Sequence, residues 1–95
     1  MDIKKLFTII EERRKSGGKD SYVFSLNKSG LNRIAQKVGE EAVEVIIAAK
    51  NKKKKEVIGE MADLWFHVLV LLSFLKIDPD EVFAELEKRH NLKKK

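Results

Sequence analysis

The segment VGEEAVEVIIAAKNKKKKEVIGEMADL, residues 38–64, carries two apolar stretches separated by four consecutive lysines. It also places four acidic side chains among valine, isoleucine, alanine, methionine and leucine. Glu41 and Glu44 are three positions apart before the lysines, and Glu60 and Asp63 are three positions apart after them. Because residues three apart share one face of a helix, each acidic pair is predicted to project from one helix face.

The lysine run Lys52–Lys55 predicts a short turn between two antiparallel helices. In such a hairpin, residues at equal distances from the turn lie at the same level. With the turn centred near residue 52, Glu44 is level with Glu60, and Glu41 is level with Asp63. We therefore expect the four acids to converge about 12 Å or more from the tip, at a rise of roughly 1.5 Å per residue.

The remaining sequence predicts an all-α, four-helix antiparallel bundle-like domain that covers residues 1–95, with a flexible lysine-rich tail at about 91–95. A short extended stretch is expected at residues 17–29. Asp78, Pro79 and Glu81 form the N-cap, first position and capping box of the last helix. The expected helices run from Asp2 to Gly17, from about Ser29 to Asn51, from about Lys54 to Lys76, and from Pro79 to about His90.

The third expected helix is apolar on nearly every side from Leu64 onward. Such a helix is normally buried all round, and a chain of 95 residues offers few places to bury it. We therefore expect a homodimer through this helix. No membrane span is expected, because the apolar run Leu64–Leu75 contains His67 and Ser73 and is too short to cross a bilayer.

The formal net charge of +5 owes much to two lysine runs, Lys52–Lys55 and Lys93–Lys95. Solvated loop and tail charge explains them, and so does attraction of an anionic ligand. A nucleic-acid partner is disfavoured because no recognition motif or interleaved aromatic set accompanies them. The absence of cysteine excludes disulfides and thiolate metal sites and fits a cytoplasmic protein.

Four converging carboxylates repel one another, so that some must be protonated or cations must lie among them. Carboxylate oxygens are the ligands that Mg²⁺ and Mn²⁺ prefer. The acids also fit a wetted helix face paired with lysines, since Lys37 and Glu41 are correctly spaced for an ion pair. Spacing alone leaves both interpretations open. A di-iron bundle is disfavoured, because neither pair has the Glu-x-x-His spacing.

The pattern Glu40-Glu41-x-x-Glu44, a spacer, then Glu60-x-x-Asp63 resembles the metal-binding signature of the all-α MazG-like nucleoside triphosphate pyrophosphatases. Within that superfamily, the chain is most similar to the phosphoribosyl-ATP pyrophosphatase family of histidine biosynthesis. The similarity runs from Ser21 to His90, through SYVFSLNKSGLNRIAQKVGEEAVEVIIAAKN, EVIGEMADLWFHVLVLL and EVFAELEKRH.

The resemblance implies Mg²⁺-assisted attack of water at the α–β phosphate linkage of phosphoribosyl-ATP, which yields phosphoribosyl-AMP and pyrophosphate. A broader MazG-like activity on other nucleoside triphosphates is the alternative. The resemblance implies metal ligands at Glu41, Glu44, Glu60 and Asp63, and Glu40 completes the catalytic set. The candidates for substrate binding, each of which also fits a surface ion pair or helix-end contact, are Arg33, Lys37, Lys50 and Asn51.

Two further side chains lie near this signature in the sequence. His67 follows Asp63 by four positions and shares the acidic face. Within an apolar helix, a lone histidine is more often a hydrogen-bonded core residue than a metal ligand. Tyr22 is expected either to reach the site from the stretch at residues 17–29 or to serve in packing.

Overall fold

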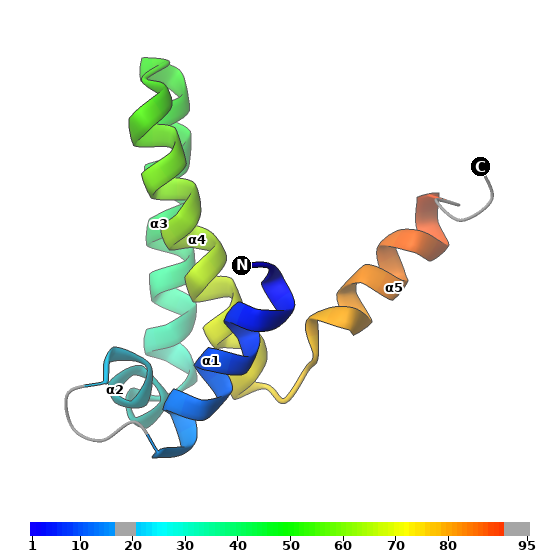
Figure 1. Cartoon of the computed structure of the whole chain (residues 1–95). Coiled ribbons are helices and arrows are strands. Elements are labelled where there is room, and N and C mark those ends of the chain that lie inside the picture. Colours follow the sequence, from blue (N-terminus) through cyan, green and yellow to red (C-terminus); the bar gives the residue numbers. More distant parts are fainter. Residues whose placement is uncertain (17–20, 91–95) are drawn as a thin grey trace.

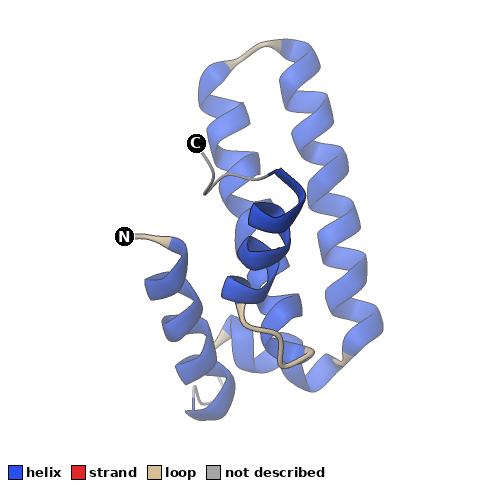
Figure 2. Ribbon diagram, turned by 90° about the vertical axis from the view of Figure 1, so that its right-hand side faces the viewer, coloured by secondary structure: helices blue, strands red, loops and turns tan. Residues whose placement is uncertain are grey.

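The computed structural model describes residues 1–16 and 21–90, and the regular secondary structure in these ranges is helical throughout (Figure 2). The all-α prediction is therefore confirmed, with five helices where four were expected. The predicted tail at 91–95 lies outside the described residues. The helices are α1 (Ile3–Ser16), α2 (Tyr22–Ser29), α3 (Leu31–Asn51), α4 (Lys54–Phe74) and α5 (Pro79–His90).

Helices α3 and α4 form the long antiparallel hairpin that dominates the molecule (Figure 1). Lys52 adopts a left-handed conformation with φ 58°, and its backbone N–H donates to the Ala49 carbonyl at 3.0 Å. Only Lys52 and Lys53 separate the two helices. The predicted turn near residue 52 is thus confirmed, and with it the register that places the acidic pairs opposite each other.

The expectation of an extended stretch at 17–29 is wrong for the part that the structure describes, because Tyr22–Ser29 is helical. Ser21 caps this helix, its hydroxyl accepting from the Phe24 backbone N–H at 3.2 Å. Val23 and Leu26, three positions apart, are buried on one side of the helix. In the sequence, the alternation of Tyr22, Phe24 and Leu26 with smaller or polar residues concealed this spacing. The rest of the predicted stretch, residues 17–20, lies outside the residues that the structure describes.

The hydrophobic core lies at the end of the hairpin opposite its tip, where α1 and α2 pack against α3 and α4 (Figure 1). One face of α1 packs against the core, because Ile3, Leu6, Phe7 and Ile10 are spaced at helical intervals: Ile10 is fully buried, and the other three are partly buried. The buried core cluster consists of Ile10, Val23, Leu26, Ile34, Leu69 and Val70.

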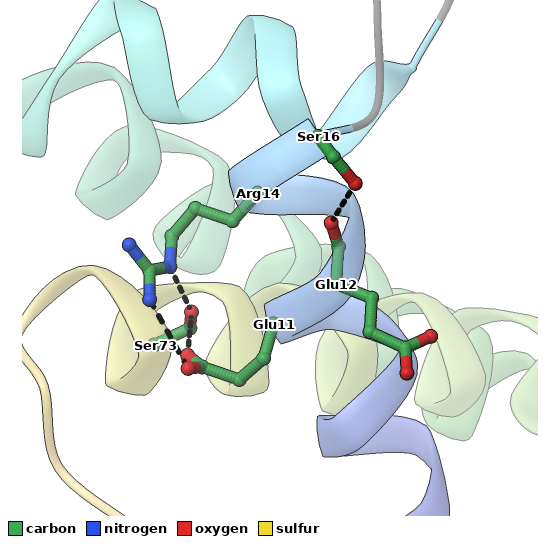
Figure 3. Close-up of polar contacts among 5 residues, drawn as sticks. All are labelled: Glu11, Glu12, Arg14, Ser16 and Ser73. Atoms are coloured by element: carbon green, nitrogen blue, oxygen red, sulfur yellow. Dashed lines mark hydrogen bonds and ion pairs between the residues drawn. The ribbon is translucent and has the colours of Figure 1, made fainter.

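A polar contact between α1 and the end of α4 closes this core (Figure 3). The Arg14 Nε donates to the buried Ser73 hydroxyl at 2.9 Å, Arg14 Nη2 lies 3.1 Å from a Glu11 carboxylate oxygen, and the Ser73 hydroxyl donates to Glu11. Burial raises the pKa of Glu11, but Ser73 and Arg14 lower it by more. The net effect is a pKa below its ordinary value.

The predicted caps are present at two helix starts. The Asp2 carboxylate accepts from the Lys5 backbone N–H at 2.8 Å. At α5, the Asp78 carboxylate accepts from Asp80 N–H at 2.8 Å, and Glu81 accepts from Asp78 N–H at 3.0 Å. The signals for the last helix therefore locate its start correctly.

The apolar face of α5 is only half-buried in the single chain. Val82, Phe83 and Leu86 all remain more than two-fifths exposed, and α5 projects from the rest of the molecule, with α1 as its main contact (Figure 1). The bundle is thus open on this side.

Helix α4 also leaves apolar surface uncovered. By length and composition it could cross a membrane, and only 22% of its apolar window is buried inside the single chain. Glu60, Asp63 and His67 interrupt this apolar stretch. A shallow apolar cavity of about 330 Å³ lies along it, lined by Val57, Ile58, Met61, Ala62 and Trp65.

Candidate metal and phosphate site

Three of the predicted acids meet between α3 and α4. Carboxylate oxygens of Glu41, Glu60 and Asp63 all lie within 4.8 Å of one another. Glu60 and Asp63 come from one face of α4, and the hairpin register brings Glu41 of α3 opposite them. We call these three residues the acid cluster.

Burial and the neighbouring acidic charges raise the pKa of Glu60 above its ordinary value. Burial raises its pKa, and the charges of Glu44, Asp63 and Glu41 raise it further. Of the neighbouring charges, that of Glu44 raises the pKa of Glu60 most, which agrees with the predicted register, although Glu44 is not one of the three clustered carboxylates. The carboxylates at this site therefore repel one another when no cation lies among them.

This donor set fits a hard divalent cation. Mg²⁺ and Mn²⁺ take oxygen ligands, and Mg²⁺ commonly binds through one or two carboxylates together with water and substrate phosphates. A cation among Glu41, Glu60 and Asp63 would remove the repulsion that raises the pKa of Glu60. The residues present thus have the chemistry that a metal-assisted phosphate site needs.

Lys37 places a positive charge beside the acid cluster. Its ammonium lies 3.5 Å from Glu40 and 3.6 Å from Glu41. Burial lowers the pKa of Lys37, but Tyr22, Glu40 and Glu41 raise it by more, so that its pKa lies above the ordinary value. The lysine is thus held as a cation at the edge of the carboxylates.

Glu40 lies on α3 next to the acid cluster and is held in its ionised form. The Gln36 amide donates to its carboxylate at 2.9 Å and lowers its pKa. Burial opposes this effect, but the charges of Lys37 and Arg33 lower the pKa further. The charge of Arg33, one turn before Lys37 on α3, thus affects the same carboxylate as Lys37.

The other two predicted substrate contacts lie elsewhere. Lys50 and Asn51 are exposed at the tip of the hairpin, nine and ten residues beyond Glu41. At 1.5 Å per residue this is a separation of about 13–15 Å along the helix. The described structure does not bring them to the acid cluster, and their role in substrate binding stays a prediction.

One connection at the site was only partly anticipated from the sequence. His67 is buried, with Nδ1 2.8 Å from the Asp63 backbone oxygen and Nε2 2.8 Å from the Tyr22 hydroxyl. His67 is thus a hydrogen-bonded core residue, as the apolar surroundings suggested. Its spacing of four from Asp63 was the available signal, whereas its link to Tyr22 depends on the packing of α2.

Known proteins are similar to this sequence over nearly its whole length. A sequence model of the family described as "Phosphoribosyl-ATP pyrophosphohydrolase" matches residues 3–90. A Geobacter metallireducens protein named "Phosphoribosyl-ATP pyrophosphatase" is 45% identical over 87 residues, which cover 92% of this chain and 80% of that protein. A Geotalea daltonii protein of the same name is 42% identical over 90 residues, covering 95% and 85% of the two chains.

Proposed function

We propose that this chain hydrolyses phosphoribosyl-ATP to phosphoribosyl-AMP and pyrophosphate, because it belongs to the phosphoribosyl-ATP pyrophosphohydrolase family. This is an early step of histidine biosynthesis. The observation that carries the proposal is the acid cluster, Glu41, Glu60 and Asp63, in a chain matched to that family over residues 3–90. We further propose that the activity is cytoplasmic, because the named relatives are biosynthetic enzymes.

The acid cluster and Glu44 would hold Mg²⁺, with Mn²⁺ as a second choice. When bound, the cation supplies charge neutralisation on the phosphate oxygens and lowers the pKa of a coordinated water. Water would attack at the α–β phosphate linkage, one P–O bond of the bridging oxygen would break, and pyrophosphate would leave. We propose that Glu40 orients that water, a role supported by its contacts with Gln36 and Lys37, which hold its carboxylate.

Lys37 and Arg33 would bind the phosphate groups from the α3 side of the site. Lys37 lies 3.5–3.6 Å from the carboxylates of Glu40 and Glu41, so its ammonium would be available to a phosphate group held at this site. A transferring phosphoryl group needs positioning and positive charge more than it needs a covalent nucleophile. The site offers both.

We also propose that the functional unit is a homodimer in which a second copy covers the apolar surface of α4. Ile58 and Trp65 on α4, and Ile46 on α3, are each more than half exposed in the single chain. Exposed apolar surface of this kind marks an interaction site in soluble proteins. The half-buried apolar side of α5 adds to the surface that the second copy would cover.

Product analysis on a nucleotide panel tests the proposed substrate. Purified protein with Mg²⁺ is incubated with phosphoribosyl-ATP and, separately, with ATP, dCTP and dUTP, and the products are separated by anion-exchange chromatography. We expect phosphoribosyl-AMP and pyrophosphate from the first substrate and little turnover of the others. Equal or better turnover of an ordinary triphosphate would instead identify the broader MazG-like activity.

A further inference from the structure

The tip of the α3–α4 hairpin carries four consecutive lysines, Lys52–Lys55, and all four side chains are exposed. The tip lies at the end of the hairpin opposite the hydrophobic core (Figure 1). Among the described residues, only Lys53 of these four forms an ion pair, with Glu56 at 3.9 Å. The run therefore presents most of its positive charge to the solvent.

The backbone at the tip favours other residue types at these positions. Lys52 has a φ of 58°, in the left-handed region that glycine adopts most readily. Lys53 is the N-cap of α4 but makes no capping hydrogen bond, and serine or aspartate is preferred there. Lys54 and Lys55 begin α4, where the helix dipole opposes positive charge. Because helix stability is lost at each of these positions, the positive charge has another role.

The lysine run lies near the acid cluster without pairing with it. Lys55 precedes Glu60 by five residues and Lys52 precedes it by eight. At 1.5 Å per residue, these separations along the hairpin are about 8–12 Å. The Debye length is about 8 Å at physiological ionic strength and about 30 Å at 0.01 M. The lysines can therefore act on a charged ligand at the cluster through space, and more strongly at low ionic strength.

We propose that Lys52–Lys55 form an anion-attracting surface that draws the phosphate groups of the substrate toward the acid cluster. The carboxylates of that cluster repel a phosphorylated ligand as it approaches, and a positive surface beside them offsets this repulsion and raises the local concentration of anions. This inference rests on the proposed function only in taking the ligand to be a polyphosphate that binds at the acid cluster.

The size of the attraction follows from Coulomb's law with salt screening. We consider Lys54 and Lys55, a ligand of charge −2 such as the complex of Mg²⁺ with pyrophosphate, and a separation of about 10 Å in water. The two lysines then strengthen binding about sevenfold at an ionic strength of about 0.01 M and about twofold at about 0.15 M. A dependence on salt of this kind distinguishes attraction through space from a direct contact.

Two double variants with the same change in net charge test the proposal. Lys54→Gln with Lys55→Gln removes charge at the tip. Lys15→Gln with Lys76→Gln removes it at the other end of the molecule, where α1 meets the end of α4. Pyrophosphate is titrated calorimetrically into each protein in buffer that contains Mg²⁺. We expect the tip variant to lose about sevenfold in affinity at about 0.01 M and about twofold at about 0.15 M, and the control to lose less than about twofold at either.

Lys53→Ser separates the proposed role from a role in the fold. The substitution would complete a capping box with Glu56, three residues further along the chain. We expect the thermal midpoint to rise by roughly 4–8 °C and pyrophosphate binding at about 0.01 M to weaken by about twofold. A lower midpoint with unchanged affinity would show that Lys53 serves the fold instead.

Four results of the titration would overturn the inference. The first is wild-type affinity in the tip variant at low ionic strength. The second is a loss that does not shrink as salt is added, which would show direct contact with the ligand. The third is an equal loss in the control, and the fourth is no pyrophosphate binding by wild type at low ionic strength. Salt-dependent binding as expected, without turnover of phosphoribosyl-ATP, would refute the proposed substrate and support the anion-attracting surface.

Discussion

Trp65→Ala should convert the proposed dimer to a monomer at ordinary protein concentrations. The Trp65 side chain is 55% exposed in the single chain, on the apolar face of α4. A tryptophan presents up to about 250 Å², so about 140 Å² remains for a second copy to cover. At about 25 cal/mol per Å², covering it contributes about 3.5 kcal/mol per subunit.

A two-fold interface uses the same residue twice, so the substitution removes up to about 7 kcal/mol from association. The alanine recovers part of the contact, and we expect a net loss of about 4–5 kcal/mol, or about a thousandfold in Kd. Sedimentation velocity over a concentration series measures this directly. Leu31→Ala, a substitution of another exposed apolar residue at the start of α3, is the control and should leave the dimer intact.

The reasoning is refuted if wild-type protein sediments as a monomer at every concentration. It is also refuted if Trp65→Ala dissociates with the wild-type Kd. Circular dichroism of the variant establishes that a change in sedimentation reflects association rather than unfolding, since Trp65 contributes little to the core of the single chain.

Three further substitutions test the fold and its charges. Glu11→Gln should lower stability by about 1–2 kcal/mol at pH 6, where the carboxylate is paired. Because the pKa of Glu11 is lowered in the folded protein, this difference from wild type should be lost as the pH falls below the ordinary value of 4.5. Thermal melts of both proteins at pH 6 and pH 3 measure the difference. Ile34→Ala, at a fully buried position, should cost about 2–5 kcal/mol in urea unfolding. Gly39→Ala meets nothing within 4 Å and should stabilise α3 by about 1 kcal/mol, and a loss of stability would place another surface against Gly39.

The convergence of the acids could be predicted because it depends only on local geometry. Helical spacing sets the faces of Glu41, Glu60 and Asp63, and a short turn fixes the register of the two helices. Neither depends on how the rest of the chain packs. The site roles of these residues and of Glu44 go beyond this geometry and stay proposals.

Features that depend on tertiary packing were harder to read from the sequence. Helix α2 is only eight residues long, and its buried pair, Val23 and Leu26, is too short a signal to outweigh the alternation around it. The spacing of Val82, Phe83 and Leu86 gives α5 an apolar side, but no sequence pattern says which surface covers it. The contact between Tyr22 and His67 joins residues 45 positions apart and requires the placement of α2 against α4.

The measurement that tests the central claim most directly is pyrophosphate release from phosphoribosyl-ATP by wild type and Asp63→Asn, with and without Mg²⁺. The exposed Asp80→Asn on α5 is the matched control. The account predicts Mg²⁺-dependent release by wild type and Asp80→Asn, and a loss of at least about a hundredfold in a folded Asp63→Asn protein, since removing even an outer partner of a metal ligand costs roughly 10–100-fold. Release that persists in Asp63→Asn, or that needs no divalent cation, would contradict it.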